Sequence, residues 1–265
     1  MDTAGIYRAL AGTPFAGQMQ RFTTIGSTNT RALEQARLGA PHGSFYVADE
    51  QTAGRGRSNH HWYSAAGDGL YLSVLLRLPV SAQELVWMPL IAGLVTHHAI
   101  AQVTGLTPDL RWPNDILLGE RKVAGILVEA LHEPATSATR PVVLGVGVNM
   151  HQEQFPPDLA TLATSLDLAS GRRSSRQQLL IALLQSLHAE LIPLGSAATR
   201  AAALAAIPGR IEAISSWIRG RAVDVHGPQA CHGTTEGLDE KGLLRVRTAD
   251  GLVTVTTGGL RAHQP

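Results

Sequence analysis

The stretch SFYVADEQTAGRGR, residues 44–57, joins a short apolar segment to a loop rich in glycine and arginine. Its first five residues are typical of a strand, which delivers the loop. Gly54 and Gly56 allow the backbone to approach a ligand closely. Arg55 and Arg57 supply fixed positive charge and forked donors suited to carboxylate or phosphate. The loop is therefore a candidate site for an anionic small molecule, although a Gly-x-Gly pair alone is also typical of a solvated turn.

Length and composition limit the function classes. The 265 residues give room for one large core, or for a main domain with a small appendage. The formal net charge of +1 gives no broad electrostatic footprint for nucleic acid. Cys231 is the single cysteine, so we expect no intrachain disulfide and a reducing, cytoplasmic setting. The sequence starts without signal-peptide features, and no apolar run of about 18 residues predicts a membrane span.

Helix and strand patterns alternate over the first two hundred residues. Ser27 or Thr28 is placed to cap a helix that Gly39 ends. The other expected elements are a strand over 70–76, a buried helix over 83–104, a hairpin of 110–118 and 122–129 turning at 119–120, a strand over 142–149 and a helix over 174–192. This order predicts an α+β main domain.

The pattern changes at about residue 208 to short alternating runs separated by glycine turns. The runs are residues 222–225, 243–247 and 252–255, with turn signals at 239–242 and 249–251. They predict a small β-barrel. We therefore divide the chain into a main domain, 1–207, and a small all-β domain, 208–265.

A second group of polar residues, RWPND, spans residues 111–115. The proline stiffens the backbone, while Asn114 adds an amide and Asp115 a carboxylate at the same point. This is a candidate ligand-binding corner, and an Asx turn beside a core tryptophan, Trp112, stays open as the alternative.

A third group, KVAGILVE, spans residues 122–129. Strand alternation places Lys122 on the face of Ala124, Ile126 and Val128, which indicates an anchored charge or a stem lying along apolar surface. Gly125 would let a ligand approach the same strand. A surface lysine is the alternative.

Two glycines interrupt the apolar strand that ends at Asn149. Gly145 and Gly147 weaken that strand unless something flat or bulky packs on them, or unless the strands pack unusually closely. The histidines and the single cysteine show no His-x-x-x-His or Cys-x-x-Cys spacing, so we expect no zinc site. Nor does any Gly-x-Ser-x-Gly motif indicate a hydrolase.

The order and spacing of these groups resemble those of the biotin–protein ligases. The resemblance runs from about residue 22 to the end and rests on Ser27-Thr28-Asn29, Gln51–Arg57, Trp112–Asp115, Lys122-x-x-Gly125-Ile126-Leu127 and Gly145-x-Gly147-x-Asn149. It implies a main domain similar to the class II aminoacyl-tRNA synthetase core, followed by an SH3-like barrel.

The resemblance also implies a two-step reaction. Biotin and MgATP form biotinyl-5′-adenylate and pyrophosphate, and a lysine of a biotin carboxyl carrier domain then attacks the mixed anhydride. The first step brings two anions together, so fixed cations must offset their repulsion. By resemblance Arg55, Arg57 and Lys122 are these cations.

The family's other contacts are carried over in the same way. The residues implied to bind biotin are Ser27, Thr28, Asn29, Gln51, Gly54, Arg55, Gly56, Arg57, Lys122 and Gly125. Those implied to lie near ATP or the adenylate are Trp62, Asn114, Asp115 and Asn149. The cofactors implied are ATP and Mg²⁺, with no protein metal site, and biotin is a substrate.

The sequence departs from the family pattern in three places. The loop continues as Ser58-Asn59-His60-His61 where the family commonly has further Arg and Gly, and Arg111 stands where lysine is usual. The N-terminal helix-turn-helix of the family's bifunctional repressors has no counterpart.

Two other functions compete with a biotin ligase. A lipoate or octanoate ligase or transferase would share the fold, but the Gly-Arg-Gly-Arg loop argues against it. A biotin-sensing regulator would need DNA contacts, and the near-neutral charge and short N-terminal segment argue against specific DNA binding. We expect a carrier-protein partner and no membrane, and the sequence leaves a homodimer open.

Overall fold

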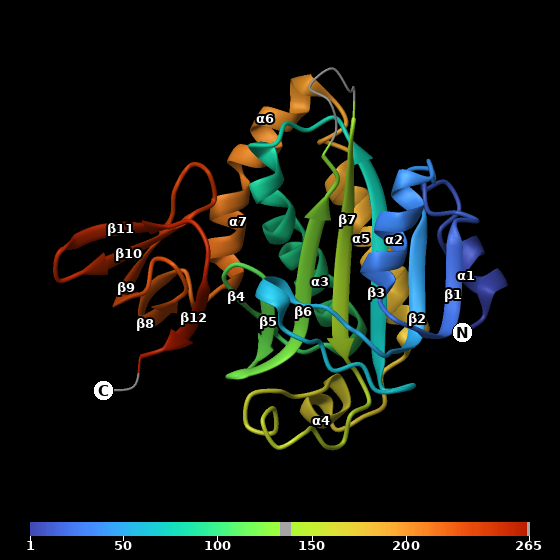
Figure 1. Ribbon diagram of the computed structural model, residues 1–265, viewed down its shortest axis with the longest axis horizontal. Coiled ribbons are helices and arrows are strands. Elements are labelled where there is room, and N and C mark those ends of the chain that lie inside the picture. Colours follow the sequence, from blue (N-terminus) through green and yellow to red (C-terminus); the bar gives the residue numbers. More distant parts are fainter. Residues whose placement is uncertain (133–138, 264–265) are drawn as a thin grey trace.

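The computed structural model describes residues 1–132 and 139–263, which form two β-sheets (Figure 1). The larger sheet has seven strands in the spatial order β1 (Met19–Ile25), β2 (Phe45–Gln51), β3 (Gly69–Leu78), β7 (Arg140–Asn149), β6 (Arg121–Ala130), β5 (Asp115–Leu118) and β4 (Asp109–Arg111). Only β1 and β2 are parallel among the described neighbours. The smaller sheet is antiparallel, in the order β11 (Gly251–Val255), β10 (Leu244–Thr248), β9 (Cys231–Leu238), β8 (Arg219–His226) and β12 (Gly259–Ala262).

Helices pack around the larger sheet. They are α1 (Thr3–Ala9), α2 (Thr28–Arg37), α3 (Met88–Thr104), α4 (Leu166–Ser170), α5 (Arg176–Leu191), α6 (Ala197–Ala205) and α7 (Ile207–Ile214), with short 3-10 turns η1 (Arg57–Asn59) and η2 (Glu84–Trp87). α2 covers one face, over β2, β3 and β7, while α3 and α5 cover the other (Figure 1). A mainly antiparallel sheet with helices on both faces confirms the predicted α+β class.

The predicted buried helix over 83–104 is confirmed as η2 and α3. Its length and composition would suit a membrane span, and it is the one such helix in the described residues. In the apolar 18-residue window of this helix, 67% is buried inside the fold. The core between α3, α5 and the sheet therefore accounts for its apolar side chains.

Local sequence signals explain how α2 starts and ends. Ser27 is its N-cap, with the hydroxyl accepting a hydrogen bond from the backbone N–H of Thr30 at 3.5 Å. The helix stops at Arg37, and Gly39 takes a left-handed φ of +86° just beyond it. This start places Thr28 and Asn29 at the helix N-terminus, facing the sheet.

The expected strand over 110–118 is wrong in one respect. Residues 112–114 form a turn, so the segment folds into two short strands, β4 and β5, which pair with each other. Asn114 stabilises the turn, because its side-chain N–H donates to the carbonyl oxygen of Ile126 at 2.8 Å. The hairpin turn at 119–120 is confirmed between β5 and β6.

The expected face of Lys122 is also wrong. Ile116 pairs with Ala124 but Leu117 pairs with Lys122, so Val123 is an extra residue in β6. Such a β-bulge reverses the alternation of side chains beyond it. Lys122 therefore lies on the face of Gly125 rather than on that of Ala124.

The smaller sheet contains the three expected strands and two more. The predicted runs over 222–225, 243–247 and 252–255 lie in β8, β10 and β11. β9 (CHGTTEGL) and β12 (GLRA) were not predicted, because neither sequence alternates apolar and polar residues. The smaller sheet contacts the larger one at the 112–114 turn, where the indole N–H of Trp112 donates to the carbonyl oxygen of Gly242 at 3.2 Å.

Candidate functional site

The loop at residues 52–68 crosses one face of the larger sheet. In Figure 1 it runs, in light blue, in front of β6 and β7. Backbone bonds hold its base, with the N–H of Thr52 and Ala53 donating to the carbonyl oxygens of Ile25 and Gly26 at 2.9 and 2.8 Å. The two sides of the loop also bond to each other, the N–H of Trp62 to the carbonyl oxygen of Gly54 at 2.9 Å. The sequence-predicted loop residues are thereby brought onto the sheet.

The departure at residues 58–61 forms the tip of this loop. Gly56 N–H donates to the carbonyl oxygen of His60 at 2.8 Å, and Arg55 forms a β-bridge with His61. Ser58 has a left-handed φ of +52°, the one such value outside glycine in the described residues. The tip is thus a closed turn held by its own backbone.

Beneath the loop, glycines leave a flat strip in the sheet. Gly125 and Gly147 are direct partners on β6 and β7. A Cβ atom on Gly125 would lie 2.7 Å from the Trp62 ring, and one on Gly147 would meet the indole at 2.5 Å. Both glycines are needed because an aromatic ring packs on them. We call Gly125, Gly145 and Gly147 the glycine floor.

The third glycine of the floor makes room for a polar side chain. A Cβ atom on Gly145 would lie 2.9 Å from the side-chain carbon of Asn29. The glycines of β6 and β7 thus make room for the Trp62 ring and the Asn29 amide. Close packing between strands is therefore not the reason for them.

Lys122 and Arg111 share one carboxylate at the edge of the floor. Lys122 Nζ lies 2.5 Å from Asp115 Oδ1, and Arg111 Nη2 lies 2.8 Å from Asp115 Oδ2. Burial alone would raise the pKa of Asp115, but the two cations hold it below its usual value. The Lys122 ammonium is also 5.3 Å from the centre of the Trp62 ring. These three charges, which we call the Asp115 triad, sum to +1.

Arg55 is paired with Glu129, a residue to which the sequence motifs assign no role. Its guanidinium makes two hydrogen bonds to that carboxylate, at 2.8 and 3.1 Å. Asn29 Nδ2 donates to the same carboxylate at 3.0 Å. Glu129 thus fixes the loop to β6 and sets the orientation of the Asn29 amide.

A polar network continues from Asn29 to the base of the loop. Ser73, a fully buried residue of β3, places its hydroxyl 2.5 Å from Asn29 Oδ1 and 2.8 Å from Thr28 Oγ1. Thr28 donates to Gln51 Oε1 from its backbone N–H and its hydroxyl, at 2.8 and 3.0 Å. Gln51 in turn donates to Ser64 at 3.0 Å. The structure brings three predicted residues together here, and Ser73 at the centre was missed because it carries no local motif.

Two of the predicted biotin-binding residues, Ser27 and Gly54, stabilise the local backbone. The Ser27 hydroxyl is the cap of α2 and is buried. Gly54 lies against the other side of the loop, where a Cβ atom would come 2.7 Å from Ser64 Oγ. Both help place the network.

Arg57 differs from the other two predicted cations. Its guanidinium donates to Asn114 Oδ1 at 3.0 Å, to the carbonyl oxygen of Gly258 at 3.2 Å and to Thr257 Oγ1 at 3.3 Å. No ion pair within residues 1–132 and 139–263 includes it. Burial lowers the pKa of Arg57, against an opposing influence of Asp115. It therefore carries a positive charge that no carboxylate of its own neutralises.

Asn149 closes the far end of the floor. Its Nδ2 donates to the carbonyl oxygen of Thr164 at 3.1 Å. Nearby, the backbone N–H of Lys122 donates to the carbonyl oxygen of Leu162 at 2.8 Å. Three buried polar atoms around this corner have no hydrogen-bond partner within the described structure: Trp62 Nε1, Gln152 Oε1 and Thr164 Oγ1. Donor and acceptor capacity therefore remains for a ligand.

The carboxylates of this site are already paired with cations and amides. No group of three or more His, Cys, Asp or Glu side chains suited to a metal ion occurs in the described part of the chain. Asp115 gives its oxygens to Lys122 and Arg111, and Glu129 gives its oxygens to Arg55 and Asn29. The site's carboxylates do not fit a protein-held magnesium ion.

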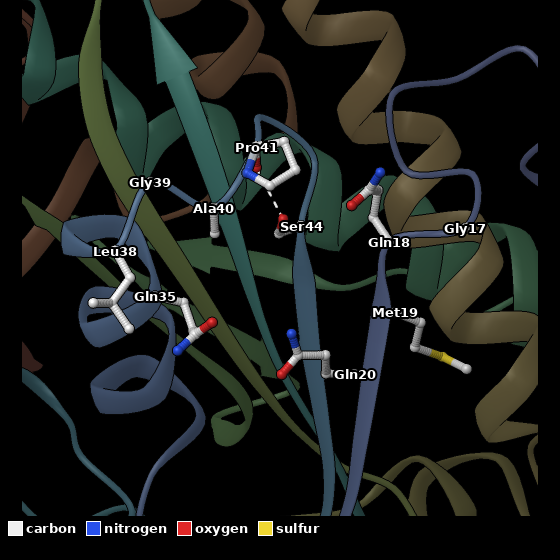
Figure 2. Close-up of a pocket in the computed structure, with 10 residues that line it drawn as sticks. All are labelled: Gly17, Gln18, Met19, Gln20, Gln35, Leu38, Gly39, Ala40, Pro41 and Ser44. Carbon is white, nitrogen blue, oxygen red and sulfur yellow. Dashed lines mark hydrogen bonds between the residues drawn. The ribbon is translucent and has the colours of Figure 1, made fainter.

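Two cavities lie outside the floor. Figure 2 shows one of about 340 Å³ between the start of β1, the end of α2 and the loop before β2, with Gln18, Gln20 and Gln35 at its wall. None of the predicted site residues lines it. A smaller cavity, about 140 Å³, lies where the two sheets meet and includes Arg57 and Asn114 in its lining.

Known proteins share this sequence and this fold. Residues 22–149 match the model of the biotin/lipoate A/B protein ligase family. The biotin–[acetyl-CoA-carboxylase] ligase of Mycobacterium tuberculosis is 34% identical over 248 residues, which cover 91% of this chain and 87% of that protein. The bifunctional ligase/repressor BirA of Bacillus spizizenii is 40% identical over 154 residues, 57% of this chain. The match spans only about half, 47%, of that relative.

A solved structure extends the similarity to the whole fold. Biotin protein ligase from Aquifex aeolicus, in complex with biotin and ATP, superimposes with a TM-score of 0.78 at 28% identity. The match covers 94% of this chain and all of that one, 100%.

Proposed function

This chain belongs to the biotin–protein ligase family, and we propose that it is the ATP-dependent ligase that attaches biotin to a carrier protein. Biotin and ATP would give biotinyl-5′-adenylate and pyrophosphate. A lysine of a biotin carboxyl carrier domain would then displace AMP. The proposal includes a class II synthetase-like main domain at 1–207, an SH3-like barrel at 208–265 and a cytoplasmic setting.

One observation carries this proposal: the positive charge around the Asn114–Asp115 corner exceeds the negative. The Asp115 triad contributes +1, and Arg57, bonded to Asn114, contributes another. A carboxylate and an α-phosphate repel each other as they meet. Fixed cations that are already in place stabilise both anions without reorganising during the reaction. Arg57 and Lys122 are the cations we assign to that task.

The glycine floor lies beside the polar network and is covered by the Trp62 ring. Because Gly125 and Gly147 have no side chains, this ring lies flat on the sheet, and a flat substrate held by the polar network would lie against it. Thr28, Asn29 and Gln51 offer donors and acceptors at one end, as a cyclic urea requires. We assign the ureido ring to that end and the carboxylate to Lys122 at the other.

The nucleotide belongs at the corner of Asn149. Trp62 offers an aromatic face, and the partnerless polar atoms of Gln152 and Thr164 offer acceptors or donors for a base. The magnesium ion that accompanies ATP would be held by the phosphates and water rather than by a set of side chains. In the second step the anhydride is already activated, so the enzyme mainly positions the incoming amine.

The direct test is labelling of an apo carrier domain. Purified protein, ATP and biotin should produce a covalently biotinylated carrier, and replacing biotin by lipoate should produce no lipoylated carrier. Lipoylation without biotinylation would instead identify a lipoate ligase. If neither the biotinylated nor the lipoylated carrier forms, the chain is not a ligase for this carrier.

A further inference from the structure

Trp217 lies between two arginines at the junction of the two sheets. It is 2% exposed and follows α7, just before β8. The guanidinium carbon of Arg221 is 3.9 Å from its ring centre, and that of Arg111 is 5.4 Å away. Both distances are within the range of cation–π attraction.

Each of these arginines is paired with a carboxylate. Arg111 pairs with Asp115, which it shares with Lys122, at 2.8 Å, and Arg221 places one nitrogen 2.8 Å from both oxygens of Glu120. A carboxylate beside each cation reduces the repulsion between the two arginines on the ring.

Hydrogen bonds fix the segment that carries the ring. The backbone N–H and hydroxyl of Ser216 donate to the Asp109 carboxylate at 3.0 and 2.5 Å. The Ser215 hydroxyl donates to the carbonyl oxygen of Leu110 at 2.5 Å. Trp217 is therefore tied to β4, the strand that ends at Arg111.

We propose that Trp217 is a positioning residue, which holds Arg111 on Asp115 and thereby sets the charge available at Lys122. The proposal rests on the ligase function proposed above. Asp115 is shared between two cations, so part of its charge is taken up by Arg111. If Arg111 left, Asp115 would pair with Lys122 alone and cancel its charge toward a substrate anion.

The contacts also explain an arginine at position 111. A planar guanidinium can lie against an aromatic ring while its N–H groups reach a carboxylate in the same plane. An ammonium can also approach a ring and a carboxylate, as that of Lys122 does, but it is a point charge and has no flat face to lie along the ring. Arg111 and Trp217 therefore act as a matched pair.

Substitution of the ring tests this role. Trp217→Leu should lower kcat for biotin-dependent ATP–pyrophosphate exchange roughly fivefold to tenfold, the scale of one cation–π contact, with little change in KM for biotin. Trp217→Phe keeps a ring and should lose less. Trp87→Leu is the matched control, because Trp87 is also buried, beside Gly242 of the smaller sheet, while the described cation–π contacts of Arg111 and Arg221 are with Trp217. A loss of kcat in the control equal to that of Trp217→Leu would overturn the proposal.

A double-mutant cycle separates positioning from general damage. In Arg111→Met, Trp217→Leu should reduce kcat no further, because the residue it positions is gone. Losses that multiply would overturn the proposal. If Trp217→Leu does not fold, Trp217→Phe replaces it in the same cycle.

If the wild-type protein has no exchange activity, that result counts against the ligase function. The pairing of Trp217 with Arg111 is then tested by the free energy of unfolding. The wild type, the two single variants of the cycle and the double variant, unfolded in urea, should show coupling between Trp217 and Arg111. Additive free energies of unfolding would overturn the pairing itself.

Discussion

At the scale of single residues, the three cations suggested by the sequence differ in what they can offer a ligand. Arg55 is occupied by Glu129, and Lys122 shares Asp115 with Arg111. Arg57 alone of the three lacks a carboxylate among the described residues. The Arg55 charge is therefore neutralised by Glu129, and Arg57 and Lys122 are the cations that we propose to face the substrate.

Lys122→Ala tests the catalytic role proposed for Lys122. The variant should keep its fold, because the side chain is 30% exposed, and should lose exchange activity by roughly a hundredfold or more. Circular dichroism and pyrophosphate exchange measure the two effects. Exchange at the wild-type rate would remove Lys122 from the mechanism.

Glu129→Gln tests the residue that the sequence did not reveal. The neutral amide cannot hold Arg55 in a charge-assisted pair, and it can donate where Asn29 needs an acceptor. We expect the KM for biotin to rise about tenfold with a smaller change in kcat, by the size of such bonds. Glu50→Gln is the control, since within residues 1–132 and 139–263 the Glu50 side chain accepts a hydrogen bond only from Thr24, a residue of the edge strand β1. An unchanged KM in Glu129→Gln would show that the pair does not place the loop.

At the scale of elements, the glycine floor depends on two adjacent strands that each lack a side chain at the same level. A methyl group on Gly147 would collide with the Trp62 indole. Gly147→Ala should therefore displace Trp62, weaken biotin binding by about tenfold and cost roughly 1–3 kcal/mol of stability from overpacking. Tryptophan fluorescence and a biotin titration measure the first two effects.

Gly209→Ala provides the comparison for that variant. Nothing lies within 4 Å of a Cβ atom there, and Gly209 is in α7, where alanine favours the helix. It should bind biotin normally. Equal binding by both variants would mean that the position of Trp62 on the floor does not affect biotin binding.

The elements also show how far sequence patterns reach. Apolar runs and caps were sufficient to predict α2, α3, α5, β2, β3 and β7. The turn at 112–114 agrees with the Asx turn beside Trp112 that was the alternative interpretation of residues 111–115. The bulge at Val123 was not predictable, because it depends on a single residue within an otherwise regular strand. Ser73 and Glu129 belong to no local motif, and only the folded sheet brings them to Asn29.

At the scale of the whole molecule, the Asp115 triad joins the turn, the hairpin and, through Trp217, the smaller sheet. Its ion pairs make stability depend on pH. The pKa of Asp115 is lowered in the folded state, against the effect of burial, so its carboxylate stabilises the fold above the unfolded pKa. That contribution is lost as the pH falls through the folded value.

Asp115→Asn should consequently be less stable than wild type by about 2 kcal/mol at about pH 7, with the difference shrinking toward about pH 3. Urea unfolding of both proteins at the two pH values measures it. The other carboxylates are common to both proteins, so the difference isolates Asp115. A constant difference across this range would contradict the assigned ion pairs.

We propose above all that the excess positive charge beside the glycine floor promotes the reaction of the biotin carboxylate with the α-phosphate of ATP. Biotin-dependent ATP–pyrophosphate exchange measures that step without any carrier protein. We expect exchange with biotin, none with lipoate, and its loss in Lys122→Ala. Exchange that needs no biotin, that occurs with lipoate instead, or that does not occur at all would contradict the account.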